Sequence, residues 1–351
     1  MANVEFNGII INERAFGAYT ETLPHQHRNA LIKSGVFVRD PRIVSMLKNQ
    51  HGSYFGVVPI KGRIGGKPVN YDGKTDIPYD GIGTLTQSFV AYGRAKAWGE
   101  LDFTTDISAG ENPLQWMGQQ VADYRDDEDT KIVMGVTNAL FNMTGDEEQA
   151  FAEKHTLDVS DTVDTVVTAE SLNNLVQQAS GDKRGQFTTV FMHSTVAKNL
   201  ENMKLLEYMK GTDANGIQRD LSMGTWNGRT VIIDDGMPYD PETGKYTTYV
   251  FGRGAFSFDS LGAKVPTEIE RIAREKGGIT VMINRWRNVL VPYGISFIGN
   301  NKVLQSGTMS PTDEHLFDPT NWAIVSNGKT GAQREGVLHR DIPIARIISK
   351  G

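Results

Sequence analysis

The chain has 351 residues, of which 39% are hydrophobic and 37 are glycine, and its formal net charge is -6. This balance is typical of a globular protein rich in turns and excludes a chain-wide basic surface for nucleic acid. The lack of cysteine excludes disulfides, thiolate metal sites and cysteine nucleophiles. No stretch approaches the roughly 18 apolar residues of a membrane helix, and the first residues lack a signal-peptide pattern. We therefore expect a soluble protein made in the cytoplasm.

The first predicted elements are a polar helix and a long loop. Residues 12–34 have a helical, polar pattern, and Pro41 ends it by keeping Asp40 out of helical angles. Residues 52–83 are rich in glycine and proline, with short bursts of β-branched and aromatic residues between turn signals. Such a segment cannot build a core of its own. It predicts a two-stranded excursion with an extended tip, which is functional or docked on a partner.

A strand and a turn are predicted at residues 85–103, followed by the strongest helix of the chain, from Pro113 to about Met143. Asn112 is its expected cap, and about 30 residues give a rod of roughly 45 Å. The middle of this helix carries the charge cluster "RDDEDTK", which begins with Arg125, Asp126, Asp127 and Glu128. Two interpretations stay open: a solvated helix face, or a face that meets charged partners on a neighbouring subunit.

Helices and strands alternate after the long helix, which indicates a mixed α/β block. We predict helices at residues 168–180 and 193–209, a loop at 216–228, two long strands within 278–298, and further strands at 187–192, 229–234, 246–252, 322–325 and 342–349.

The stretch "VIIDDGMPYD" places Asp234 and Asp235 directly after an apolar strand. Adjacent carboxylates could bind a metal or act as acid and base, and with His193 and Ser194 they suggest a hydrolytic triad. However, the chain has no G-x-S-x-G elbow around Ser194, which suits a helix cap better, as does Thr195. Carboxylates before a glycine and a proline are typical of a turn. We therefore expect Asp234 and Asp235 to bond backbone amides or a neighbouring subunit.

Two other motifs carry no convincing chemistry. "GRIGGKP" at residues 62–68 lacks the spacing and the strand-to-helix context of a phosphate-binding loop. His25 and His27 are two residues apart, so on a helix they point to different faces and form a poor chelate.

Seven phrases resemble, in order, segments of tailed-phage major capsid proteins with the Hong Kong 97-type fold. They lie at residues 30–43, 91–103, 112–141, 191–200, 226–238, 246–258 and 283–297, so the likeness extends over nearly the whole chain. The resemblance implies an α+β fold with five parts: an N-terminal arm (1–50), an extended loop (51–84), a peripheral domain with a spine helix (85–164, helix 113–143), an axial domain (165–265), and return strands with a tail (266–351).

The resemblance also implies a structural protein and no enzyme, with no cofactor and no metal. Copies would assemble as pentamers and hexamers into the icosahedral head shell that encloses double-stranded DNA without sequence-specific binding. The expected location is the virion capsid, after assembly in the bacterial host cytoplasm. Residues expected at subunit contacts are Arg63, Lys67, Lys74, Arg125, Asp126, Asp127, Glu128, Asp234 and Asp235.

Further partners follow from the same resemblance. Because the recognisable block begins close to Met1, we expect a separate scaffolding protein, together with a portal and decoration proteins and no membrane. Some family members cross-link a loop lysine to an asparagine of a partner. The matching residues here are Lys61, Lys67 or Lys74 with Asn321 or Asn327, although lysines in an exposed loop usually serve solubility.

Two alternatives remain at this point. The first is an encapsulin-like shell of a cellular compartment, which shares the fold and would need a pocket for its cargo. The second is a soluble α/β hydrolase that uses Asp234, Asp235 and His193.

Overall fold

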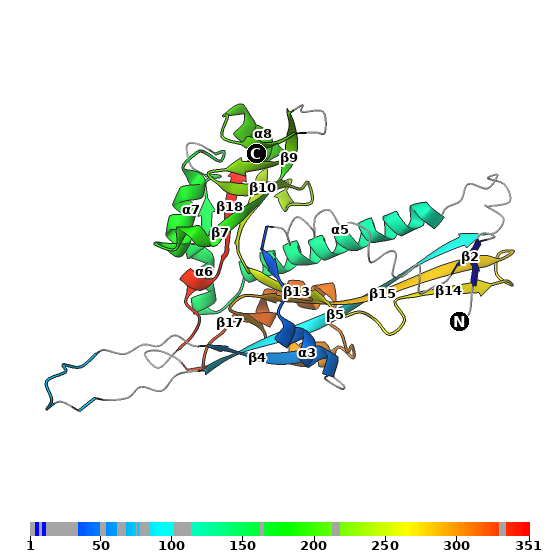
Figure 1. Ribbon diagram of the computed structural model, residues 1–351, viewed down its shortest axis with the longest axis horizontal. Coiled ribbons are helices and arrows are strands. Elements are labelled where there is room, and N and C mark those ends of the chain that lie inside the picture. Colours follow the sequence, from blue (N-terminus) through cyan, green and yellow to red (C-terminus); the bar gives the residue numbers. More distant parts are fainter. Residues whose placement is uncertain are drawn as a thin grey trace.

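The computed structural model describes residues 4–6, 9–11, 34–49, 54–61, 68–74, 76–77, 84–101, 114–161, 165–212, 218–329 and 335–351. The predicted helix at residues 12–34 lies outside them, apart from its last residue. Two large sheets form the framework, and the long helix α5 lies along one of them (Figure 1). No helix in the described ranges is long and apolar enough to cross a membrane.

The first sheet has eight strands in the order β6-β18-β12-β7-β10-β9-β8, with β11 paired to β12. Their bounds are β6 Thr156–Asp158, β7 Phe187–Met192, β8 Glu207–Thr212, β9 Gln218–Trp226, β10 Arg229–Ile233, β11 Tyr239–Asp240, β12 Lys245–Gly252 and β18 Ile344–Lys350. The predicted strands at residues 187–192, 229–234, 246–252 and 342–349 are confirmed to within two residues. The sheet takes β6 and β18 from outside residues 165–265, so the proposed axial domain and this sheet do not coincide.

Both faces of the eight-stranded sheet are covered at its centre, so the consecutive residues from Thr189 to Met192 of β7 are all buried. Val190 and Val250 face the helices α7 (Ser171–Ser180) and α8 (Ser194–Asn202). Because successive side chains in a strand point to opposite faces, Phe191 and Phe251 face the other way, into the core shared with α5.

The second sheet has six strands in the order β3-β13-β15-β5-β4, with β14 also paired to β15. The bounds are β3 Phe37–Val38, β4 Phe55–Lys61, β5 Thr84–Leu101, β13 Phe256–Ser260, β14 Thr267–Ile272 and β15 Ile279–Pro292. Two small sheets accompany it: β1 (Val4–Phe6) with β2 (Ile9–Ile11), and β16 (Ile295–Phe297) with β17 (Trp322–Ile324).

The helix α5 spans Leu114–Leu140, so the predicted long helix is confirmed at 27 residues, or about 40 Å. Its expected cap, Asn112, lies outside the described residues. The Tyr124 ring meets Trp98 of β5 edge-on at 5.5 Å and Trp286 of β15 at 6.4 Å. These contacts hold the helix along the two longest strands of the chain.

Shorter helices complete the chain. They are α3 Pro41–Asn49, α6 Asp146–Lys154, α9 Asn300–Gln305 and α10 Asp313–Phe317, with the 3-10 turns η1 Arg184–Gln186, η2 Pro319–Asn321 and η4 His339–Asp341.

The helix α3 was not predicted, although Asp40 before it is non-helical, as expected. Pro41 is the first residue of α3, a position where its missing N–H costs nothing. The carboxylate of Asp40 accepts from the Arg42 amide at 2.9 Å, and so satisfies a free donor at the helix start.

The strand β5 runs unbroken for 18 residues, so no turn falls within residues 85–101, and the last two residues of the predicted segment lie outside the described residues. Its first part pairs with β4, from Thr84 opposite Lys61 to Val90 opposite Phe55. Its second part pairs with β15 as far as Leu101, opposite Ile279. Because two different partners share the strand, neither pairing could be inferred from local pattern alone.

The predicted helix at residues 193–209 is only half correct, because α8 ends at Asn202. Lys204 has a φ of 55°, which stops a helix, and β8 then begins at Glu207. Leu206 is 7% exposed and packs in the core beneath α7 and α8.

The loop predicted at residues 216–228 is wrong, because β9 occupies most of it. Trp226 pairs with Arg229 across a two-residue turn in which Asn227 and Gly228 have φ values of 48° and 75°. Positive φ at both positions is the tight hairpin turn that Asn-Gly favours. This dipeptide was therefore an available signal for the β9–β10 hairpin.

The segment 278–298 contains one long and one short strand where two long ones were predicted. The chain turns after Pro292, where Gly294 has a φ of 75°. The buried Gln87 amide stabilises this corner, since it donates to the carbonyls of Pro292 at 2.6 Å and Ile295 at 2.7 Å.

Candidate functional site

The turn after β10 uses its two carboxylates to bind backbone amides. Asp234 Oδ1 accepts from the Gly236 N–H at 2.8 Å, and Asp235 Oδ1 accepts from the Ser194 N–H at 3.2 Å. Hydrogen bonding by Ser194 is the main reason why the pKa of the Asp235 carboxyl is lowered. Both bonds confirm the prediction that these side chains bond backbone amides.

The neighbouring His193 caps α8, a role that was predicted for Ser194 or Thr195. Its Nδ1 accepts from the Thr195 N–H at 3.1 Å, and its Nε2 lies 3.8 Å from Asp235 Oδ1. The ring and the carboxylate thus serve the start of a helix. A nucleophile–base pair needs a hydrogen bond between the base and the nucleophile, and in the described residues the His193 ring contacts the Thr195 amide and Asp235 rather than the Ser194 hydroxyl.

We expect replacement of Asp234 by alanine to lower the free energy of unfolding by about 1 kcal/mol, because the turn loses its side-chain acceptor. Asp234→Asn is the matched control, since an asparagine oxygen accepts the same bond and should preserve stability. Urea denaturation of both variants measures the difference. Equal stability of the two variants would contradict a turn role for this carboxylate.

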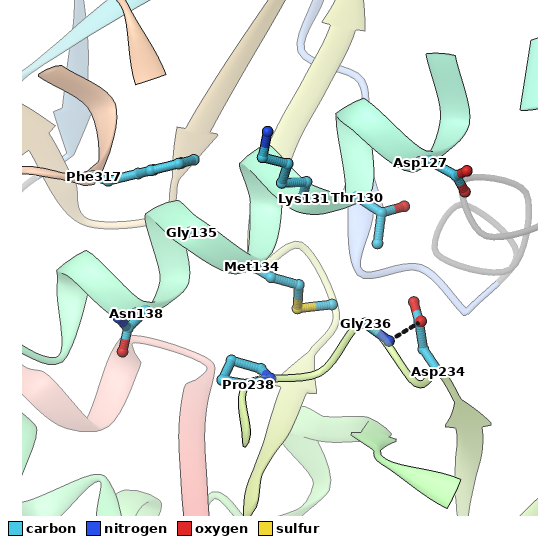
Figure 2. Close-up of a pocket in the computed structure, with 10 residues that line it drawn as sticks. All are labelled: Asp127, Thr130, Lys131, Met134, Gly135, Asn138, Asp234, Gly236, Pro238 and Phe317. Atoms are coloured by element: carbon cyan, nitrogen blue, oxygen red, sulfur yellow. Dashed lines mark hydrogen bonds between the residues drawn. The ribbon is translucent and has the colours of Figure 1, made fainter. Parts of the chain in front are cut away.

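A groove of about 540 Å³ lies between α5 and the turn after β10 (Figure 2). It brings together two predicted residues that are distant in sequence, Asp127 of the charge cluster and Asp234 of the turn. Met134 and Pro238 form an apolar part of its wall. Phe317 of α10 approaches α5 at Gly135, where an added Cβ would lie 2.2 Å from the Phe317 ring.

The charge cluster on α5 is not one solvated face, which corrects the first interpretation. Arg125, Asp126 and Asp129 are 7%, 3% and 5% exposed. Asp129 Oδ1 accepts from the Asn288 side chain of β15 at 2.7 Å, and the Arg125 guanidinium lies 5.7 Å from the Trp286 ring centre. A contact of Arg125 or Asp126 with a neighbour would require this packing to open.

The outer side of the cluster is smaller than predicted. Asp127 and Lys131 are exposed, and Glu128 is half-buried. Lys131 Nζ lies 3.8 Å from Glu128 and 3.9 Å from Asp313 of α10. Residues 125, 126 and 129 share one side of a helix, so their spacing was a signal that half of the cluster faces inward.

The extended loop leaves the body of the molecule after β4 and returns at β5 (Figure 1). Tyr71 and Ile77 are 91% and 71% exposed. Lys74, a predicted contact residue, is also exposed, and its N–H donates to Asp72 Oδ1 at 2.9 Å. Arg63 and Lys67 lie outside the described residues. The sequence analysis predicted only lysines and an arginine of this loop as contact residues and did not identify the exposed apolar side chains.

One of the two candidate asparagines for a cross-link is inaccessible. Asn321 is 0% exposed, and its Nδ2 donates to the His315 carbonyl at 2.8 Å. Asn327, by contrast, is exposed. A search of the described residues finds no group of three or more His, Asp or Glu side chains arranged to bind a metal ion.

Sequence comparison identifies one curated relative along nearly the full length. The major capsid protein of Bacillus phage SPP1 is 28% identical over 332 residues, which cover 94% of this chain and 96% of the relative. No family model matches the chain.

Two solved structures share the fold. The capsid asymmetric unit of cyanophage Pam1 matches with a TM-score of 0.52 and 8% identity, over 99% of this chain and 96% of the other. The acidic stable capsid structure of Helicobacter pylori bacteriophage KHP30 matches with a TM-score of 0.50 and 11% identity, over 89% and 87%. At such identities the likeness shows the fold alone, which is the mixed α+β fold expected from the sequence.

Proposed function

Since the chain is a tailed-phage major capsid protein with the Hong Kong 97-type fold, which forms the shell of a phage head, we propose that its copies assemble as pentamers and hexamers. Identical subunits that bind head to tail close into rings, and rings of two sizes tile an icosahedral shell. In this scheme the eight-stranded sheet and its helices lie near the ring centre. The six-stranded sheet and α5 lie at its periphery.

The observation that supports this proposal is the extended loop. Its side chains Tyr71, Ile77 and Val69 are 91%, 71% and 39% exposed. The loop itself extends away from the two large sheets (Figure 1). Exposed apolar side chains on an extended backbone indicate a partner surface, because contact removes them from water. We propose that the partner is the adjacent copy in the same ring.

The remaining predicted contacts belong to the same proposal. Lys74 on the loop and Asp127, Asp234 and Asp235 beside the α5 groove lie at or near the surface of one copy. Opposite charges across a subunit boundary favour the correct register more than they add affinity. We propose that these residues orient neighbouring copies.

The other partners are a separate scaffolding protein, a portal and decoration proteins. Packaged double-stranded DNA fills the shell without sequence-specific contacts. The net charge of -6 supports this last point, because an inner wall that bound phosphate tightly would hinder packaging. The curated relative is a phage capsid protein, which favours this function over a compartment shell and over a hydrolase.

Negative-stain electron microscopy of the purified chain tests the proposal. We expect capsomers, tubes or irregular shells from the chain alone, and closed shells of uniform size when the scaffolding protein is co-expressed. Uniform closed shells from the chain alone would overturn the need for a scaffold. A chain that stays monomeric under both conditions would overturn assembly through the proposed contacts.

A further inference from the structure

The two large sheets are joined at one junction. Within the described residues the chain passes between them three times: through α5 and α6 into β6, from β12 into β13, and from β17 through η4 into β18. These passages contact one another. The N–H of Gly252, the last residue of β12, donates to the Pro343 carbonyl at 2.8 Å, and the Arg346 N–H of β18 donates to the His155 carbonyl at 2.9 Å.

His155 lies at the centre of this junction. It follows the last residue of α6, is 0% exposed, and packs against the Phe151 ring at 4.4 Å. Its Nδ1 lies 2.7 Å from the Ile344 carbonyl at the start of β18. Its Nε2 lies 3.4 Å from Nδ1 of His339 in η4. One buried ring therefore connects the first passage to two points of the third.

These contacts define the proton positions of both rings. A carbonyl only accepts, so His155 must carry its proton on Nδ1 and donate it to Ile344. The bare Nε2 then accepts from Nδ1 of His339. When both rings are protonated, neither has a bare nitrogen, and the contact places two N–H groups against each other.

The charged groups around the pair oppose protonation of His155 and act in both directions on His339. From α6, Lys154 opposes protonation of both rings, and Glu147 favours protonation of His339 alone. From η4, Arg340 opposes and Asp341 favours protonation of His339, although Asp341 also forms an ion pair with Lys183. From β18, the Arg346 guanidinium lies over the Phe141 ring and donates to Thr156.

We propose that His155 and His339 form an acid-sensitive clamp, which holds η4 and the start of β18 against α6 near neutral pH and releases them when the rings are protonated. The clamp lies inside one copy of the chain, so it acts whether or not the proposed capsomer contacts are correct. Its release would loosen the junction of the two sheets. The angle between the two halves of a subunit would then be less tightly constrained.

The direction of the pH effect follows from burial. Desolvation lowers the pKa of His155 from 6.5 to about 4, and it also lowers the pKa of His339. The two histidines therefore bind a proton less readily in the folded junction than in the opened one. The contribution of the clamp to the stability of the junction is complete above pH 6.5 and decreases as the pH falls toward 4. The opening constant is the ratio of opened to closed junction. For His155, the difference between a pKa of 6.5 in the opened junction and about 4 in the folded one allows this constant to rise at most roughly 30-fold between neutral pH and pH 5.

Hydrogen exchange of the unassembled full-length chain, followed by mass spectrometry between pH 7.5 and 5.0, measures this opening. After correction for the intrinsic exchange rate, we expect the opening constant of residues 335–346, measured on peptides that span them, to be at least tenfold higher at pH 5.0 than at pH 7.5. Peptides from α8 in the same sample should not change. A uniform response along the chain, or no response in residues 335–346, would overturn the clamp.

The variant His155→Asn separates titration from structure. Its side-chain N–H retains a donor to the Ile344 carbonyl but cannot be protonated, so the acid response of residues 335–346 should fall below about threefold. His193→Asn removes a histidine away from the junction and should keep the wild-type response. An unchanged response in His155→Asn would overturn the proposal. If that variant does not fold, the test depends on the wild-type protein alone. An acid response confined to residues 335–346 supports the clamp, and a uniform response along the chain overturns it.

Discussion

Replacement of Gly252 by alanine is expected to destabilise the folded chain by at least about 3 kcal/mol. An added Cβ would lie 2.4 Å from the Gln186 carbonyl oxygen and 2.6 Å from Cβ of Pro343. Both obstacles are fixed, one as main chain and the other as part of a proline ring next to the hydrogen bond from Gly252. Overpacking against groups that cannot move is among the most destabilising effects of a single substitution.

The physical context explains why this position matters. The pairing of β12 with β7 shifts its register between Phe251 and Gly252, so the main chain bends there toward its neighbours. The same bend brings the passage from β12 into β13 against the passage into β18. A side chain at residue 252 would push apart the junction that joins the two sheets.

Urea denaturation of the unassembled protein measures this effect. Gly185→Ala is the matched control, because an added Cβ at Gly185 meets nothing within 4 Å. Its free energy of unfolding should remain within about 0.5 kcal/mol of the wild type. A Gly252→Ala protein as stable as the Gly185→Ala protein would show that the packing at this junction is looser than described.

The double substitution Tyr71→Ser and Ile77→Ser is expected to raise at least tenfold the protein concentration required for assembly. These side chains are 91% and 71% exposed in the single chain, so their loss costs little folding stability. On a neighbouring copy they would bury apolar area worth roughly 1.5–3 kcal/mol for each fully covered side chain. The effect recurs in every copy of the ring, so a modest loss per contact becomes a large loss of assembly.

Light scattering and negative-stain microscopy follow assembly of this variant, and circular dichroism follows its folding. Asp76→Ser is the control within the same loop, because it changes an exposed polar residue and removes no apolar area. Normal assembly of the double variant at the wild-type concentration would refute the loop contact. A lowered melting temperature would indicate that the loop also supports its own subunit.

Segments with a strong local pattern were correctly predicted from the sequence. The helix that became α5 was found because its apolar residues recur near a helical period, and the strands that became β7 and β12 because they are short runs rich in β-branched and aromatic residues. The turn at Asp234 was also predictable, since an aspartate before glycine has a local hydrogen bond to make. Each of these features depends on residues that are close together in the sequence.

Errors arose where a distant partner decided the structure. Residues 218–226 are polar by pattern, yet they form β9 because β8 and β10 supply main-chain partners on both sides. Arg125, Asp126 and Asp129 were expected at a surface, but β15 approaches α5 and covers them. Local sequence patterns on α5 cannot predict that β15, about 160 residues away in the chain, packs against it.

The sequence by itself determined the long helix, the loop with no core of its own and the turn role of Asp234, because local hydrogen bonds and side-chain periodicity control these features, while the fold class followed from the resemblance of the seven phrases. Only the tertiary structure decided which charges of the α5 cluster are buried, which apolar side chains stand on the loop, and that His155 meets His339 from 184 residues away. The physical reason is that burial and desolvation depend on what packs against a residue in space, and that packing is a property of the whole chain.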